Sequence, residues 1–196
     1  SLQYLGPLFL DYQVNGNLMS RQGNRSPCAC PHGVFPARGD DRWIAIAVFS
    51  DEEWDNLCKV MGRPAWTRRK ALQTFMGRKD NEDKVERSLS EWTKNYEAYE
   101  LMKLLQKTGV RAGVVQDSKG IFEDEQTRYR GELVELKHRE MGRHYYPTSA
   151  FNLSRTPRKL RLPAPCLGEH NEFVYTKLLE MSDEEFVELQ SCGALD

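Results

Sequence analysis

The pattern of hydrophobic and polar positions is clearest between residues 34 and 116. Two apolar segments, 34–37 and 43–49, flank the polar stretch 38–42, which contains Gly39. This arrangement predicts a β-hairpin with a glycine-containing loop. Every second residue of the longer segment is expected to lie on one face of the strand: Trp43, Ala45, Ala47 and Phe49.

A helix is expected directly after the hairpin. Ser50 followed by Glu53 has the sequence signature of a capping box, and Gly62 is suited to a left-handed C-terminal cap. Apolar residues between them recur at helical spacing, which predicts a buried stripe of Trp54, Leu57, Cys58 and Met61. Cys58 is therefore interpreted as a small core residue.

Two more helices, 82–92 and 96–107, and a β-branched strand, 110–116, complete this part of the pattern. Gly109 is expected to end the third helix, and the strand to return to the hairpin. Together these elements predict a small α+β unit from about residue 34 to 116. The residues expected to point inward from the two helices are Val85, Leu89, Trp92, Leu101, Leu104 and Leu105.

The flanking segments carry weaker signals. Residues 5–12 have helix-like apolar spacing, 15–20 break it, and 21–33 lack periodicity, which predicts a loop with defined turns. Beyond residue 117 the chain becomes more polar and charged. The expected elements there are a short helix at 121–130, strands at 132–137 and 150–153, and helices at 172–180 and 183–191, the last opened by a capping box of Ser182 and Glu185.

Composition places the chain among ordinary globular proteins. Of its 196 residues 39% are hydrophobic and 29% charged, so it can bury a core. The longest apolar run, 43–49, is too short to cross a bilayer, and the sequence opens without a signal-peptide pattern, so we expect a cytoplasmic protein. The five cysteines favour free thiols. A net charge of −1 predicts no long-range attraction of nucleic acid.

Several short motifs follow one another in an order that resembles one enzyme family. They are RQGN at 21–24, the loop, hairpin and capped helix up to residue 64, Trp92-Thr93, TGVRAGVVQ at 108–116 and LGEHN at 167–171. This order is similar to that of the family III CoA-transferases of the CaiB/BaiF type. The resemblance is to the C-terminal half of these enzymes, because the half that carries their nucleophilic aspartate and most CoA-binding groups has no counterpart. We therefore expect truncation or processing before Ser1.

The resemblance implies an α+β architecture within an α/β family and a division of the chain. Residues 1–33 are expected to form a linker and an active-site loop that enter from a large domain. Residues 34–117 are expected to form a small α+β domain with an antiparallel sheet and three helices, and 118–196 a segment that returns to the large domain. That large domain, Rossmann-like in the family, is missing here. The family forms an interlocked homodimer, so self-association or apolar patches are expected.

The chemistry implied by the resemblance is transfer of coenzyme A from an acyl-CoA to a carboxylate acceptor, through a mixed anhydride and an aspartyl-CoA thioester. No residue of this chain is assigned a catalytic role, and no metal is expected. The loop that shields the anhydride in the family corresponds to residues 25–33, anchored by Arg21 and Asn24. The loop residues singled out by resemblance are Arg21, Asn24, Ala29, Cys30, His32 and Gly33. Glycines of the family loop are replaced at 26–31, which predicts a stiffer loop.

Other roles were weighed for the histidines and cysteines. Cys28, Cys30 and His32 alternate as metal ligands can, but zinc sites favour two or more residues between paired cysteines and need a fourth ligand. His32 as a general base is an alternative to a hydrogen bond with the backbone, which we favour. His170 is expected to begin a terminal helix, with Asn171 near its cap.

The basic run RTPRKLR at 155–161 and the tryptophans have similar alternatives. The run could bind a phosphate, but a solvated crossing segment is favoured, and the run lacks the interleaved aromatics of single-strand nucleic-acid binders. The tryptophans are expected in the core rather than on a stacking surface, with at least three on inward faces: Trp43, Trp54, Trp66 and Trp92.

Two functions from different classes remain open. The chain is part of a CoA-transferase, inactive alone, with an acyl-CoA and a carboxylate acceptor as partners, or it is a stand-alone module that binds or dimerises without catalysis. An acyl-CoA racemase is a further alternative within the family. Neither nucleic acid nor a membrane is an expected partner, and the sequence does not select an acyl group.

Overall fold

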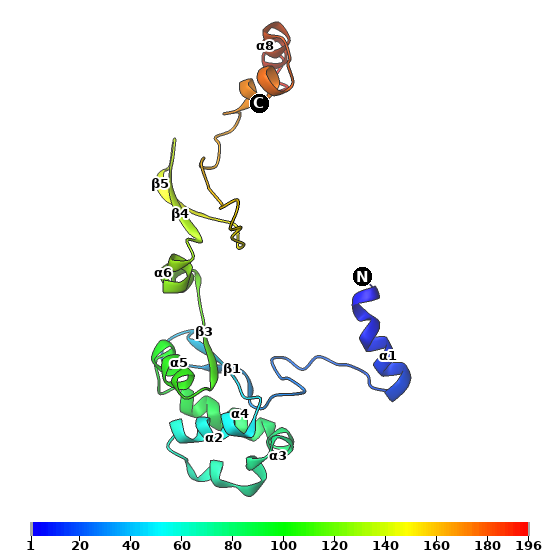
Figure 1. Cartoon of the computed structure of the whole chain (residues 1–196), viewed down its shortest axis with the longest axis vertical. Helices are drawn as coiled ribbons and strands as arrows, with labels where there is room; N and C mark the ends of the chain where they lie inside the picture. Colours follow the sequence, from blue (N-terminus) through cyan, green and yellow to red (C-terminus); the bar gives the residue numbers. More distant parts are fainter. Residues whose placement is uncertain (1, 196) are drawn as a thin grey trace. The chain divides into compact units, whose positions relative to one another are not determined.

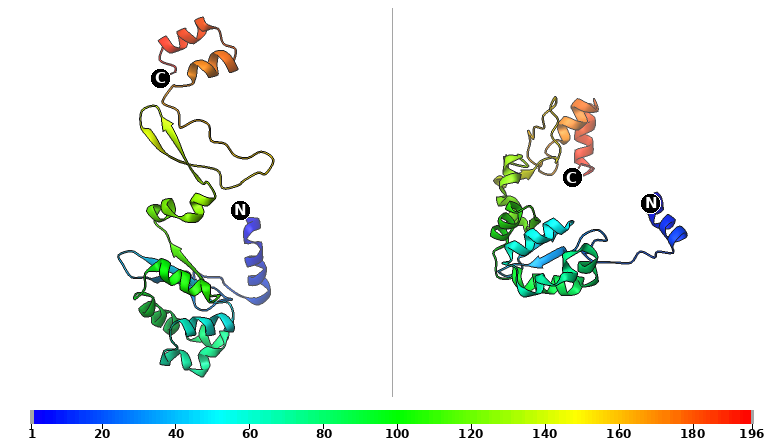
Figure 2. Two further views of the ribbon diagram at one scale, coloured as in Figure 1. Left: turned by 60° about the vertical axis from the view of Figure 1, so that its left-hand side comes forward. Right: turned by 60° about the horizontal axis from the view of Figure 1, so that its bottom comes forward.

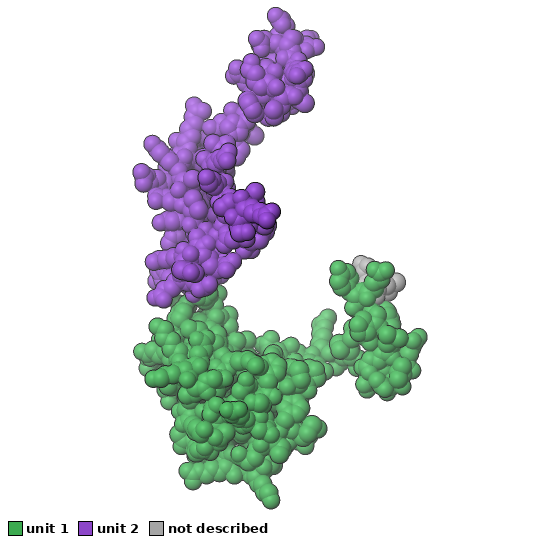
Figure 3. Space-filling model, in the orientation of Figure 1, with its two compact units in different colours: residues 1–116 green, residues 117–196 purple. Residues whose placement is uncertain are grey.

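The computed structural model describes residues 2–195 and divides the chain into two compact units, with the boundary between Gln116 and Asp117 (Figure 3). The first unit is built on a three-stranded antiparallel sheet of β1 (His32–Pro36), β2 (Trp43–Ala47) and β3 (Arg111–Val115), with β2 in the centre. The predicted hairpin and return strand are therefore confirmed. The hairpin loop contains Gly39 at φ +119°, where a Cβ would lie 2.9 Å from the side chain of Arg42.

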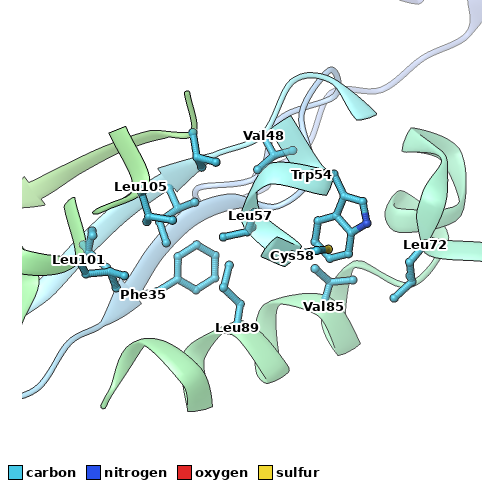
Figure 4. Close-up of a cluster of buried hydrophobic side chains, with 13 residues drawn as sticks. Phe35, Val48, Trp54, Leu57, Cys58, Leu72, Val85, Leu89, Leu101 and Leu105 are labelled. Carbon is cyan, nitrogen blue, oxygen red and sulfur yellow. The ribbon is translucent and has the colours of Figure 1, made fainter. Parts of the chain in front are cut away.

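Four α-helices accompany this sheet: α2 (Asp51–Val60), α3 (Phe75–Asp80), α4 (Glu82–Thr93) and α5 (Ala98–Lys107). Helix α5 packs along β3, and α4 packs on β1 (Figures 1 and 2). The core lies between sheet and helices, where Phe35 is surrounded by Leu57, Leu89, Leu101 and Leu105 (Figure 4). The predicted α+β fold is confirmed, with more helices than the expected three.

The residues of β2 alternate between the core and an outer face of the sheet. Ile44 and Ile46 are buried, as is Val48 just beyond the strand, while Trp43 is 39% and Phe49 41% exposed. The face predicted for Trp43, Ala45, Ala47 and Phe49 is therefore the outer one. Among the tryptophans, Trp54 is buried and Trp66 and Trp92 pack against the core, but Trp43 does not.

The caps of α2 follow the sequence signals with one difference. The Ser50 hydroxyl accepts a hydrogen bond from the Glu53 amide (3.1 Å), as a capping box requires. In a capping box the Glu53 carboxylate would accept from the amide of Ser50. It accepts instead from the amide of Phe49 (2.6 Å), one residue earlier. At the other end Gly62 has φ +74°, the left-handed cap that was expected.

Two predictions in this unit are wrong. Leu104 was expected to point inward but is 41% exposed, because the buried face of α5 is formed by Ala98, Leu101 and Leu105. The helix begins at Ala98 rather than residue 96, since the Glu97 side chain caps it and the Tyr96 ring packs on Trp92, with centroids 4.9 Å apart.

No element was predicted for residues 63–81, which contain two short 3₁₀ helices, η2 (Ala65–Arg68) and η3 (Lys70–Gln73), and α3. A glycine allows η3 and α3 to approach closely. A Cβ at Gly77 would lie 1.7 Å from the carbonyl oxygen of Ala71, so no larger residue fits there without a backbone shift.

The N-terminal segment forms a 3₁₀ turn, η1 (Leu2–Leu5), and α1 (Gly6–Asn15). The predicted helix is present and ends at Gly16, whose φ is +71°. None of the residues of α1 is buried, and four of its apolar side chains are exposed: Phe9, Leu10, Tyr12 and Val14.

The second unit contains α6 (Ser118–Glu123), α7 (Glu125–Tyr129), an antiparallel hairpin of β4 (Leu133–His138) and β5 (Gly142–Pro147), a π-helix η4 (Phe173–Leu178) and α8 (Asp183–Ser191). The single helix predicted at 121–130 is thus two helices, because the Asp124 side chain starts a second one. The second capping box is confirmed: Ser182 and Glu185 bond reciprocally.

The strand predicted at 150–153 is wrong, and β5, which was not predicted, pairs with β4 instead. The Arg158 guanidinium donates to the carbonyls of Arg130 and Gly131, just before β4, and of Ser149, just after β5. These bonds hold the chain around residue 158 to the two ends of the hairpin. Arg158 belongs to the basic run, so one of its cations has a structural role. Along the described chain, no helix is long and apolar enough to cross a membrane.

The packing of α5 gives a stability prediction. Leu101→Ala should lower the free energy of unfolding by about 2–5 kcal/mol, because it opens a cavity in the core. Leu104→Ala, on the same helix but 41% exposed, should cost less than about 1 kcal/mol. Urea unfolding followed by tryptophan fluorescence measures both, and equal losses would contradict the assignment of the core face.

Candidate functional site

The loop at residues 21–33 is bound to α3 and α4 through positively and negatively charged side chains. The Arg25 guanidinium donates to the carboxylates of Asp83 and Glu86, with 2.6 Å to Glu86 Oε2. Lys79 Nζ donates to the carbonyl of Ser26 (3.0 Å) and to Glu82 (2.7 Å). The loop is therefore fixed at its start by two cations, one from the loop and one from α3.

These contacts shift two pKa values. Hydrogen bonds to Glu86 and Asp83 raise the pKa of the Arg25 guanidinium above its ordinary value. The hydrogen bond from Arg25 in turn lowers the pKa of the Asp83 carboxyl. A lowered carboxyl pKa adds stability above the unfolded-state value, and this contribution is lost as the pH falls through the folded-state pKa.

Arg78 fixes the middle of the loop from within the core. Its side chain is fully buried; Nε donates to the Cys30 carbonyl (2.9 Å) and Nη1 to the Leu72 carbonyl (3.2 Å). Nη2 lies 2.8 Å from the Asp51 carboxylate, and the guanidinium stands 5.4 Å from the centre of the Trp54 ring. A buried charge requires such partners, so this part of the loop is held in one position.

Ala29 and Cys30, two of the predicted loop residues, are fully buried. The Cys30 amide donates to the Val48 carbonyl, and the Val48 amide donates to the Pro31 carbonyl, both at 2.9 Å, so the loop continues the hairpin pairing. Burial, reinforced by the nearby Glu82, raises the pKa of the Cys30 thiol to about 12. The thiol is therefore protonated at neutral pH and is not available as a nucleophile.

The His32 side chain contacts the backbone carbonyl of Asn24. Nδ1 of His32 lies 2.5 Å from the Asn24 carbonyl oxygen, and the imidazole packs edge-on against Phe49, with centroids 6.1 Å apart. The histidine thus makes the backbone hydrogen bond that the sequence analysis favoured over a role as base. Arg21 is exposed and makes no side-chain hydrogen bond or ion pair within residues 2–195.

The strand register places His32 on the same face of the sheet as a cation that the sequence analysis did not select, Arg111. His32 pairs with Ala47, and Ala47 pairs with Arg111, so two polar side chains flank a small residue on the outer face. The Arg111 guanidinium covers the Phe49 ring at 4.5 Å and lies 3.5 Å from Glu53. Arg111 belongs to the TGVRAGVVQ motif, so a signal for it was present.

A cavity of about 530 Å³ lies on this outer face. Asn24, His32 and Gly33 come together in its lining with Arg25 and Arg111, over a floor that includes Ala45 and Gly113. Ala29, Cys30 and Arg21 are not among the lining residues. No carboxylate or thiol lines the cavity among the described residues. Its two cations, Arg25 and Arg111, are paired with carboxylates of Asp83, Glu86 and Glu53 outside the lining.

The remaining candidates lie elsewhere. Among residues 2–195, no group of three or more His, Cys, Asp or Glu side chains is arranged to hold a metal ion. His170 is exposed. Asn171 does not cap a helix with its side chain; it donates instead to the Leu195 carbonyl (3.0 Å), which joins η4 to the end of the chain.

The role of Arg78 is testable by removing its charge and donors. Arg78→Met should lower the free energy of unfolding by about 2–5 kcal/mol, because the Cys30 and Leu72 carbonyls lose their donors. Arg68→Met, at a neighbouring exposed arginine, should cost less than about 1 kcal/mol. Chemical denaturation measures both free energies of unfolding. An unchanged stability of the Arg78→Met protein would contradict the assignment.

Thiol reactivity tests the burial of the loop. At pH 8 Cys28, which is exposed, should react with a disulfide reagent at least about tenfold faster than Cys30 and Cys58. Burial raises the pKa of these two thiols to about 12 and about 11, so little thiolate forms until the pH approaches those values. Labelling followed by peptide mass spectrometry measures each rate; fast labelling of Cys30 in the folded chain would show an open loop.

Comparison with known proteins agrees with the motif order. The profile of CoA-transferase family III matches residues 1–171. Over 92% of this chain, succinyl-CoA–D-citramalate CoA-transferase of Chloroflexus aurantiacus is 26% identical, and formyl-CoA:oxalate CoA-transferase of Bradyrhizobium sp. is 27% identical. The chain spans less than half of these relatives, 45% and 43% of their lengths.

Solved structures show the same fold. A CaiB/BaiF family protein from Brucella suis superposes with a TM-score of 0.74 at 23% identity, covering 90% of this chain and 45% of that one. Rv3272 from Mycobacterium tuberculosis superposes with a TM-score of 0.63 at 17% identity, covering 88% and 44%. The match of the family profile to most of the chain shows that this protein belongs to the family III CoA-transferases.

Proposed function

We propose that this chain is part of an enzyme that transfers coenzyme A from an acyl-CoA donor to a carboxylate acceptor. The reaction proceeds through a mixed anhydride and an aspartyl-CoA thioester, and the nucleophilic aspartate lies outside these 196 residues. Family membership and the names of the relatives support this reaction. The absence of a carboxylate among the described residues of the outer-face cavity agrees with a nucleophile supplied from elsewhere.

The observation that carries the proposal is the meeting of Asn24, His32, Gly33 and Arg111 at one cavity. In this enzyme the loop at 21–33 covers the reacting groups. A mixed anhydride hydrolyses if water reaches it, so a loop held by Arg25, Arg78 and Lys79 suits the shielding role better than a mobile one. The positive charge of Arg111 at the cavity favours an anionic substrate group, such as the acceptor carboxylate.

The two units have different roles in the proposed enzyme. Residues 34–117 act as its small domain, and residues 118–196 return to a large Rossmann-like domain. The enzyme works in the cytoplasm as an interlocked homodimer. Exposed apolar side chains on both units support an interface that covers them in the dimer. They include Phe9 and Tyr12 in the first unit and Leu167 and Leu178 in the second.

The substrates follow the relatives in chemical class. We propose short acyl-CoA donors of the succinyl-CoA or formyl-CoA kind and small carboxylate acceptors, on the basis of the relatives' names. The racemase alternative within the family uses the same CoA thioester. A non-catalytic binding module is the second candidate, and it agrees equally with a described cavity lining that holds no carboxylate or thiol.

The shielding role predicts a change in how the intermediate divides between transfer and hydrolysis. In the native protein purified from its source cells, His32→Ala should increase hydrolysis relative to transfer by about tenfold. The reason is that the loop loses the hydrogen bond between His32 and the Asn24 carbonyl. Transfer is assayed with succinyl-CoA or formyl-CoA as donor and citramalate, malate or oxalate as acceptor, and free CoA release measures hydrolysis.

The matched control is His32→Asn, which keeps a side-chain donor near the position of Nδ1 and should stay close to the unmodified protein. Circular dichroism and denaturation establish that both variants are folded. An unchanged ratio in the folded His32→Ala protein would remove the shielding role. A lack of CoA transfer with every donor and acceptor pair would favour the binding module.

A further inference from the structure

A second cavity, of about 240 Å³, lies between α4 and the two 3₁₀ helices η2 and η3. It shares no lining residue with the cavity at the loop. Asp83 and Glu86 of α4 hold Arg25 of the loop, whereas Lys84, Val85 and Arg87 of the same helix line the second cavity. At 3.6 residues per turn Lys84 and Val85 lie on a different side of α4 from Asp83 and Glu86, and Arg87, one turn after Asp83, lies at the edge between the two sets. The second cavity is therefore a separate feature of the first unit.

Three cations surround this cavity: Arg69, Lys84 and Arg87. All three side chains are exposed, and within residues 2–195 none of them forms an ion pair or a side-chain hydrogen bond. On α4 an acidic residue lies one turn from Arg87 on either side, Asp83 and Glu91. Arg87 contributes to lowering the pKa of the Asp83 carboxyl, and Glu91 lies 2.7 Å from Lys94 Nζ. Asp83 is itself bound by Arg25, so the three cations keep their capacity for an anionic ligand.

The floor of the cavity is apolar and includes a tryptophan. Leu72 and Val85 line it and belong to the buried core (Figure 4). Trp66 also lines it, and its ring packs against Trp54 with centroids 5.9 Å apart. A ligand here would contact an aromatic ring below and positive charge around its rim.

We propose that this cavity binds a small carboxylate with an aromatic or branched apolar body. Arginine pairs with a carboxylate through two parallel N–H donors, and the apolar floor and Trp66 would cover the rest of such a molecule. Inorganic phosphate would satisfy the cations but leave the floor exposed to water. The volume is below that of sites for drug-sized ligands, which suits a molecule of one ring.

Calorimetric titration of the 196-residue chain with 3-phenylpropionate tests the proposal. The acid should bind with a Kd in the high-micromolar to millimolar range, as expected for a one-ring ligand. The neutral 3-phenylpropanamide should bind at least about tenfold more weakly, because it lacks the charge that the cations recognise. Quenching of tryptophan fluorescence by the acid should be reduced in Trp66→Phe.

A charge-matched pair of variants locates the site. Lys84→Gln with Arg87→Gln should weaken binding of the acid by about tenfold or more. Lys103→Gln with Lys107→Gln removes the same charge from α5, outside the lining, and should change the Kd by less than about twofold. Equal loss in both pairs, equal affinity for acid and amide, binding of inorganic phosphate as tight as that of the acid, or no binding would each overturn the proposal.

Discussion

The buried guanidinium of Arg78 is the interaction on which the first unit depends. It joins the loop, through the Cys30 carbonyl, to η3, through the Leu72 carbonyl, and to α2, through Asp51. These three segments are far apart in the sequence, and none of them is paired to another in the sheet. Because a buried charge is costly without partners, each segment must keep its position for the others to remain satisfied. The position of the loop is in this way tied to the stability of the core.

Helix α4 connects the two functional features of this unit. Its acidic residues bind Arg25 and keep the start of the loop beside the outer face of the sheet. Its basic residues face a different cavity, with a floor formed by the core. The loop and the second cavity therefore both contact one helix, while His32 and Arg111 flank Ala47 on the outer face of the sheet.

The sequence predicts those parts of the fold that rest on local signals. The capped helix after Ser50, the hairpin and the second capping box at Ser182 follow from side chains that bond within a few residues. Leu104 was misplaced because the spacing allows it on the inner face, while the rotation of α5 against β3 does not. The elements between 63 and 81 were missed because they depend on long-range contacts of Arg78 and on the close approach at Gly77. The candidate site was found only in part for the same reason: strand pairing places Arg111 and His32 on either side of Ala47, which spacing along the chain does not reveal.

We propose that this chain is part of a CoA-transferase whose nucleophile lies outside these residues. The most direct test is mass spectrometry of the native protein, purified from its source cells and incubated with an acyl-CoA. We expect a polypeptide about twice as long as this chain, since the relatives are covered to 43–45%, with a CoA adduct on an aspartate outside residues 1–196. A native polypeptide of this length, or an adduct on a residue of this chain, would contradict it.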